Sequence, residues 1–187
     1  MTSIPTLLTY LRILLIPIFV VVFFLPYSWV NDVTTIIFGV AAVTDWLDGY
    51  LARKLNQTSR FGAFLDPVAD KLIVGAALIL LVQAHPNPWM TIATVVIIGR
   101  EIAISALREW MAEIGESAQV AVSNVGKWKT TAQMVALFML LYNEPLLGVS
   151  MYLLGMIFLY IAVILTLWSM VIYMKAAWPA LRKEEGK

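Results

Sequence analysis

A chain of 187 residues that is 61% hydrophobic and 13% charged, with a formal net charge of +1, does not have the composition of a soluble domain, because such domains are roughly 45–50% apolar and about 25% charged. The composition indicates an integral membrane protein, and the length suits a single domain over residues 1–187. The sequence has no cysteine and one histidine, which excludes disulfides, thiolate metal sites and a histidine-rich metal centre.

The first apolar segment, residues 6–25, is long enough to span a bilayer and is interrupted by Arg12. We interpret it as a retained helix rather than a cleaved signal peptide, because a charge lies inside the apolar run and no small-residue cleavage site follows. Turns and polar linkers separate five further segments, and we expect helices over residues 33–54, 61–83, 89–113, 125–142 and 147–177. The sequence therefore predicts an all-α integral membrane protein, a bundle of six transmembrane helices.

The positive charges predict the orientation of this bundle. All 13 Lys and Arg residues fall toward one side of it: Arg12, Arg53, Lys54, Arg60, Lys71, Arg100, Arg108, Lys127, Lys129, Lys175, Arg182, Lys183 and Lys187. The turns on the opposite side contain Asp32, His85 and Glu144, and no Lys or Arg. Positive residues are enriched on the cytoplasmic side of membrane proteins, so we expect both termini in the cytoplasm. Membrane lipids are expected partners and nucleic acid is not.

Four aspartates lie in or beside the second and third expected helices. Asp45 and Asp48 are three residues apart and Asp66 and Asp70 are four apart, so each pair shares one helix face. A carboxylate at mid-membrane depth costs roughly 2.5–3.5 kcal/mol on insertion, and four would cost on the order of 10 kcal/mol together. A compensating positive charge is therefore expected among them.

The neighbours of these aspartates point to a cation and an anionic ligand. Gly49 and Ala52 lie on the same helix face as Asp45 and Asp48, and their small side chains leave room for a ligand or a neighbouring helix. Oxygen donors without Cys or His select hard cations such as Mg²⁺, Mn²⁺ or Ca²⁺. Two such ions would offset four carboxylates and would suit phosphoryl transfer, while Arg53 and Lys71 could meet an anionic substrate. The alternative is that the aspartates are helix caps and surface ion pairs at the membrane boundary.

The complete pattern, D-x2-D-G-x2-A-R-x8-G-x3-D-x3-D, resembles the signature of the CDP-alcohol phosphotransferase family. The resemblance implies a homodimer with a dinuclear Mg²⁺ or Mn²⁺ site open to the cytoplasm, in which an alcohol displaces CMP from a CDP-linked lipid. It implies that Asp45, Asp48, Asp66 and Asp70 are metal ligands and that Asp70 is also the general base. It further implies that the CDP site is lined by Gly49, Ala52, Arg53 and Gly62.

The second half of the chain carries the evidence about the acceptor alcohol. Arg100, Arg108, Lys127 and Lys129 lie near the expected cytoplasmic ends of the fourth and fifth helices. Basic groups there ordinarily contact lipid phosphates, but clustered cations also suit an acceptor that carries a phosphate itself. The segments GREI, LRE and S-x2-GKWKT, with IPTLLTYLRILLIP at the start, resemble the bacterial branch of the family that uses CDP-diacylglycerol and sn-glycerol 3-phosphate. That resemblance implies phosphatidylglycerophosphate as product and the bacterial inner membrane as location.

Three alternatives stay open at this point. A related enzyme could use another acceptor and make cardiolipin, phosphatidylinositol phosphate or phosphatidylserine. The aspartates could instead belong to a divalent-cation transport path, although the outer halves of the second and third helices offer few polar groups for one. A catalytically inactive assembly protein is the third alternative, and the intact set of four aspartates argues against it.

Overall fold

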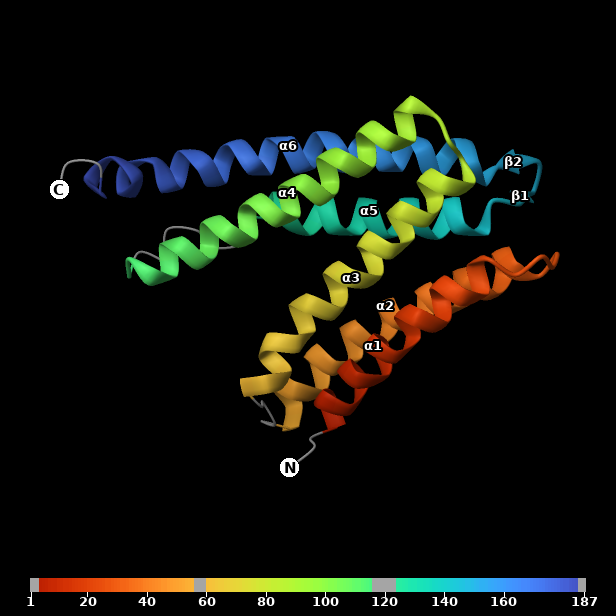
Figure 1. The fold of residues 1–187 in the computed structure, drawn as a ribbon, viewed down its shortest axis with the longest axis horizontal. Helices are drawn as coiled ribbons and strands as arrows, with labels where there is room; N and C mark the ends of the chain where they lie inside the picture. The colour runs from red at the N-terminus through yellow and green to blue at the C-terminus, as the bar shows by residue number, and fades with distance from the viewer. Residues whose placement is uncertain (1–3, 56–59, 116–123, 185–187) are drawn as a thin grey trace. The chain divides into compact units, whose positions relative to one another are not determined.

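The computed structural model describes residues 4–55, 60–115 and 124–184 and is almost entirely helical. Figure 1 shows the elements in chain order. The helices and strands are α1 (Ile4–Phe23), α2 (Val30–Leu55), α3 (Arg60–Ala84), α4 (Pro88–Glu113), α5 (Asn124–Tyr142), β1 (Pro145–Leu146), β2 (Val149–Ser150) and α6 (Met151–Glu184). The six helices match the six expected segments, with ends that differ from the expected ones by a few residues.

The main difference from the expected elements lies between α5 and α6, where we predicted a helix from residue 147. The chain instead forms a short antiparallel hairpin in which Leu146 pairs with Val149. Leu147 and Gly148 make its turn and both have a positive φ, of 52° and 81°, as the commonest two-residue hairpin turns require. A helix cannot pass through two such residues, so α6 begins only at Met151. The predicted start of the last helix at residue 147 was therefore wrong by four residues, and the rest of the fold is helical as predicted.

The chain divides into two compact units. The first contains residues 1–86 and 137–155, in which α1 packs against both α2 and α3. Phe19 of α1, Phe38 of α2 and Ile73 of α3 are almost completely buried there. These side chains belong to the apolar core of the unit. The aspartates lie toward the C-terminal end of α2 and the N-terminal end of α3.

The second unit contains residues 87–136 and 156–187, and therefore α4, most of α5 and most of α6. Asn87 caps the start of α4, because its side chain accepts a hydrogen bond of 2.9 Å from the Met90 backbone N–H, and Pro88 occupies the first turn. Ile104, Met111, Tyr173 and Ala177 make a buried core cluster between α4 and α6. The helix α4 also carries Arg100, Glu101 and Arg108.

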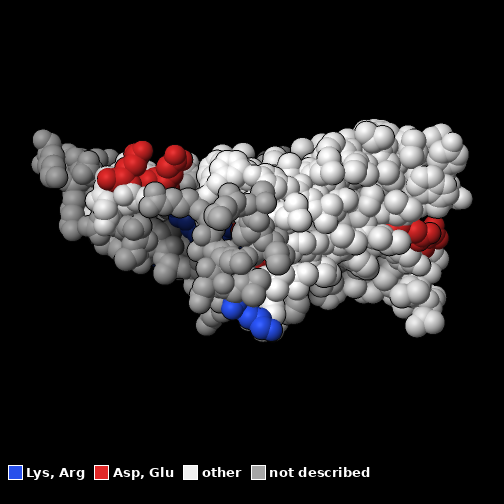
Figure 2. Space-filling view, turned by 90° about the horizontal axis from the view of Figure 1, so that it is seen from below, with Lys and Arg blue, Asp and Glu red and all other residues white. Residues whose placement is uncertain are grey.

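Within the residues that the structure describes, four helices are long and apolar enough to cross a membrane: the candidate spans are Thr6–Phe23, Val30–Leu51, Pro88–Glu113 and Met151–Pro179. Many large apolar side chains on them face outward, among them Leu14, Val43, Val95 and Ile164. Figure 2 shows one face on which most of the described surface is uncharged. These features are those of a membrane-embedded protein. Neither α3 nor α5 is among the four, so six spans and the orientation of the termini stay predictions.

Candidate functional site

The aspartates of α2 and α3 come together around an arginine of α1. Arg12 is completely buried, and one of its terminal nitrogens lies 2.9 Å from an Asp45 oxygen and 3.0 Å from an Asp70 oxygen. Its other terminal nitrogen donates a hydrogen bond to Asp48. A guanidinium carries five N–H groups in a fixed plane, which allows it to serve several carboxylates at once. The positive charge that the sequence required is therefore supplied, in this structure, by the chain itself.

The fourth aspartate is held by the same helix. Thr9 lies three residues before Arg12, on the same face of α1, and its hydroxyl donates a hydrogen bond to Asp66. We name Arg12, Thr9 and the four aspartates the acidic cluster. Within it Asp48 is the deeply buried carboxylate, with a side chain 4% exposed, whereas that of Asp70 is 41% exposed. Asp70 is therefore accessible to a molecule from outside while remaining in contact with Arg12.

The residues predicted to line a nucleotide site are placed only in part. Gly49 is half-buried, and no heavy atom lies within 4 Å of the position that a Cβ would take, so there is space beside the backbone as the sequence predicted. Gly62 is buried in the first turn of α3. Ala52 and Arg53 belong to α2, but their side chains lie outside the described part of the structure.

The acidic cluster fits a divalent cation in chemistry but is closed by Arg12 in this arrangement. The aspartates offer a metal ion carboxylate oxygens, which hard cations prefer as ligands. Three of these carboxylates, those of Asp45, Asp48 and Asp70, contact the single guanidinium of Arg12. Among the described residues, however, no group of three or more acidic, His or Cys side chains is arranged to hold a metal ion directly. An ion can therefore join these carboxylates only if the guanidinium gives up some of them.

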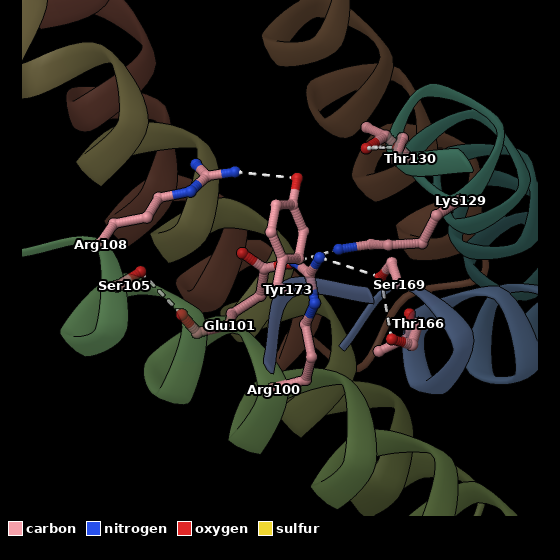
Figure 3. A network of polar contacts seen from close by, with 10 residues as sticks. Arg100, Glu101, Ser105, Arg108, Lys129, Thr130, Thr166, Ser169 and Tyr173 are labelled. Atoms are coloured by element: carbon pink, nitrogen blue, oxygen red, sulfur yellow. Dashed lines mark hydrogen bonds and ion pairs between the residues drawn. The ribbon is translucent and has the colours of Figure 1, made fainter. Parts of the chain in front are cut away.

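Three of the four predicted basic residues, Arg100, Arg108 and Lys129, lie in a second cluster, which Figure 3 shows. Arg100 of α4 donates a 2.9 Å hydrogen bond to Glu101, and Lys129 of α5 forms an ion pair with the same carboxylate oxygen. The other terminal nitrogen of Arg100 donates to the Ser169 hydroxyl of α6 at 3.0 Å. Arg100 and Lys129 are both buried. A buried cation requires a partner, and one glutamate serves two of them here.

Arg108 joins this cluster through an aromatic residue. One of its terminal nitrogens donates to the Tyr173 hydroxyl at 3.2 Å, and its guanidinium lies 5.3 Å from the centre of the Tyr173 ring. Arg108 is not among the described partners of Glu101, which are Arg100 and Lys129. Arg100, Glu101, Arg108, Lys129, Ser169 and Tyr173 are named the basic cluster. The side chain of Lys127, on α5, lies outside the described part of the structure.

Sequence reasoning missed Arg12 and Thr9 as members of the acidic cluster, and Ser169 and Tyr173 as members of the basic one. Arg12 gave a signal, because a charge inside an apolar span needs a partner, but it was used only to argue for a retained helix and for the orientation. On α6, Ser169 and Tyr173 are four residues apart in a mostly apolar stretch of the helix. Such spacing places them on one helix face, and that spacing was the available signal.

Comparisons with known proteins confirm the family resemblance. A sequence profile for the family described as CDP-alcohol phosphatidyltransferase matches residues 2–168. A protein of Pseudomonas fluorescens named CDP-diacylglycerol–glycerol-3-phosphate 3-phosphatidyltransferase is 55% identical over 188 residues, which cover 99% of this chain and 95% of the relative. Proteins of the same name from Haemophilus influenzae and Salmonella paratyphi A are 57% and 54% identical, and each alignment covers 94% of this chain with 93% and 94% of the relative.

Proposed function

Because the chain belongs to the CDP-alcohol phosphatidyltransferase family, we propose that it transfers the phosphatidyl group of CDP-diacylglycerol to sn-glycerol 3-phosphate, giving phosphatidylglycerophosphate and CMP. The observation that carries this function is the 54–57% identity, over nearly the whole chain, to relatives named for that reaction. The two charged clusters supply the chemistry that the reaction needs. The acidic cluster is rich in carboxylates, which would hold metal ions beside the donor, CDP-diacylglycerol. The basic cluster is rich in cations, which would bind a phosphorylated acceptor.

On the donor side, the acidic cluster would hold divalent cations. Members of the family generally use such ions, and we propose two Mg²⁺ or Mn²⁺ ions per protomer. Their ligands would be Asp45, Asp48, Asp66 and Asp70. When bound, the ions neutralise phosphate oxygens and make CMP a better leaving group. The CDP group would lie against Gly49, Ala52, Arg53 and Gly62, where the open space beside Gly49 supports a close approach to the backbone.

Asp70 is proposed as the general base. Of the three carboxylates that contact Arg12, its side chain is the most exposed, so it can reach a substrate hydroxyl. It would take the proton of the glycerol 1-hydroxyl as that oxygen attacks the β-phosphorus of the CDP-lipid. The new phosphorus–oxygen bond forms as the bond to the CMP oxygen breaks, and CMP leaves with those electrons. Asp48, buried against Arg12, is too enclosed for this role.

The acceptor phosphate would bind to the basic cluster, and we propose Arg100, Arg108, Lys127 and Lys129 as its contacts. The basic cluster contains three described cations, Arg100, Arg108 and Lys129, and one glutamate, which leaves a formal excess of two positive charges. A phosphate monoester carries about 1.5–2 negative charges near neutral pH. Arg100 also has a buried Nε with no hydrogen-bond partner among the described residues. An anionic ligand would complete the contacts of this side chain.

The cellular setting follows from the sequence pattern. We propose a single domain of six spans in the bacterial inner membrane, with both termini and both charged clusters on the cytoplasmic side. On this side a water-soluble acceptor is available, and CMP would be released there. We also propose a homodimer, as the family resemblance implies.

The reaction is tested with purified protein, CDP-diacylglycerol and Mg²⁺ or Mn²⁺, by measuring CMP release with each candidate acceptor in turn. We expect release with sn-glycerol 3-phosphate and little with serine, inositol 1-phosphate or phosphatidylglycerol. A preference for one of the other acceptors would replace the proposed reaction with that of a related enzyme. Metal flux into liposomes without CMP release would point to a transporter.

A further inference from the structure

We propose that Tyr173 is a positioning residue for the acceptor site, because its ring and its hydroxyl together hold Arg100 and Arg108 in place while leaving their charges available to an anion. This proposal rests on the proposed function of the basic cluster. Neither the sequence pattern nor the names of the relatives assign a role to this tyrosine.

Both arginines of α4 contact the same ring (Figure 3). The Arg100 guanidinium lies 5.6 Å from the centre of the Tyr173 ring, and that of Arg108 lies 5.3 Å from it. Both distances are within the range in which a cation is attracted by an aromatic ring. The Tyr173 hydroxyl also accepts the 3.2 Å hydrogen bond from Arg108. One side chain of α6 therefore holds two cations that lie two turns apart on α4.

The ring itself is fixed by its surroundings. Tyr173 is only 3% exposed and belongs to the buried core cluster with Ile104, Met111 and Ala177. A buried ring in such packing has little rotational freedom. Arg108, by contrast, is an exposed side chain, and a long exposed side chain loses considerable entropy when a ligand orders it. Contact with a fixed ring would reduce that loss before the ligand arrives.

The choice of an aromatic partner matters for charge. Glu101 holds Arg100 and Lys129 by neutralising one positive charge. A second carboxylate beside Arg108 would cancel another, and the cluster would then attract a phosphate less strongly. The face of an aromatic ring is partly negative but carries no net charge. Tyr173 therefore orients Arg108 without reducing the positive excess that an acceptor phosphate would meet.

The test compares two substitutions at this position with a matched control on the same helix. Tyr173→Phe removes only the hydroxyl, and Tyr173→Leu removes the ring as well. The control is Tyr160→Phe, because the Tyr160 hydroxyl donates to the Trp89 backbone oxygen and Tyr160 lies 13 residues before Tyr173 on the same helix. For each protein, CMP release gives the KM for sn-glycerol 3-phosphate, the KM for CDP-diacylglycerol and kcat, and thermal melting reports the folded state.

We expect the KM for sn-glycerol 3-phosphate to rise about threefold in Tyr173→Phe and about tenfold or more in Tyr173→Leu. The KM for CDP-diacylglycerol should stay within about twofold of wild type in both, and Tyr160→Phe should match wild type throughout. An unchanged acceptor KM in Tyr173→Phe would overturn the proposal, even if Tyr173→Leu fails to fold. An equal rise in both KM values would also overturn it, since that result indicates a general structural role.

Failure of the proposal for Tyr173 can be distinguished from failure of the proposed function. If wild-type protein releases no CMP with sn-glycerol 3-phosphate, the acceptor assignment is wrong and the proposal falls with it. If the wild type is active with this acceptor and the Tyr173 variants keep its KM, the proposed function stands and only the role of Tyr173 is wrong.

Discussion

The acidic and basic clusters are built on the same plan with opposite charge. In the acidic cluster, three carboxylates contact the single guanidinium of Arg12. In the basic cluster, two cations contact the single carboxylate of Glu101. Each cluster thus contains one residue of the minority sign that holds the others together, and each keeps an excess of the majority sign. Neither cluster is neutralised by its own ion pairs. The acidic cluster keeps a negative excess that would attract a cation, and the basic cluster keeps a positive excess that would attract an anion.

The two minority residues differ in how enclosed they are. Arg12 has no exposed surface, whereas the Glu101 side chain is 27% exposed. Removing one partner of a buried ion pair leaves an uncompensated charge and costs about 3–5 kcal/mol, while exposed pairs contribute far less. Changes in the acidic cluster should therefore have larger effects than changes in the basic one.

The largest effect is expected from Asp70→Asn. The substitution keeps the size of the side chain but removes the proposed base, and general-base catalysis contributes typically about 10²–10⁴-fold. We expect CMP release to fall by roughly 10³-fold, while CDP-diacylglycerol still raises the melting temperature. Asp32→Asn, in the first turn of α2, serves as the control and should be as active as wild type. Near-normal turnover of Asp70→Asn would remove Asp70 from the role of base.

The next effect is on stability, in Arg12→Met. Without the guanidinium, Asp45, Asp48 and Asp70 lose their common partner, and we expect the free energy of unfolding of metal-free protein to fall by about 3–5 kcal/mol. The same change removes the competitor for divalent ions. Mn²⁺ should therefore raise the melting temperature more in this variant than in wild type.

Arg12→Lys is the companion variant for this prediction. A lysine keeps the charge but lacks the planar fork that reaches several carboxylates, so an intermediate melting temperature is expected. A loss of stability in Arg12→Met that Mn²⁺ does not reduce would contradict the idea that guanidinium and metal share the same carboxylates.

A smaller effect is expected at the opposite cluster, in Lys129→Met. A hydrogen bond to a charged group contributes about 1.5–3 kcal/mol, so the KM for sn-glycerol 3-phosphate should rise roughly 10- to 100-fold. The KM for CDP-diacylglycerol should not change, because the donor would bind at the other cluster. Lys175→Met on α6 is a control that removes an exposed lysine. Equal effects on both KM values would mean that Lys129 supports the fold and not the acceptor.

The sequence predicted the six helices and the charged residues in the majority of each cluster better than it predicted the residues that contact them. Apolar segments and aspartate spacing are local patterns, and they placed Asp45, Asp48, Asp66 and Asp70 on adjacent helices correctly. The contact between Arg12 and Asp70 joins residues 58 positions apart, and no local pattern encodes such a distance. The hairpin turn at Leu147 was missed because a leucine with positive φ is rare and has no sequence signal.

The smallest effect, in Glu101→Gln, is the test of the common plan itself. Glutamine keeps an oxygen acceptor for Arg100 and Lys129 but removes the negative charge, so the excess of the three described cations rises from two to three. We expect metal-free, ligand-free protein to lose about 1 kcal/mol of stability. Inorganic phosphate should then raise its melting temperature more than that of wild type, because the anion supplies the missing charge. This is the response of Arg12→Met to Mn²⁺ with the signs reversed. If phosphate stabilises Glu101→Gln and wild type equally, the basic cluster is a structural network, and only the acidic cluster is built to receive an ion.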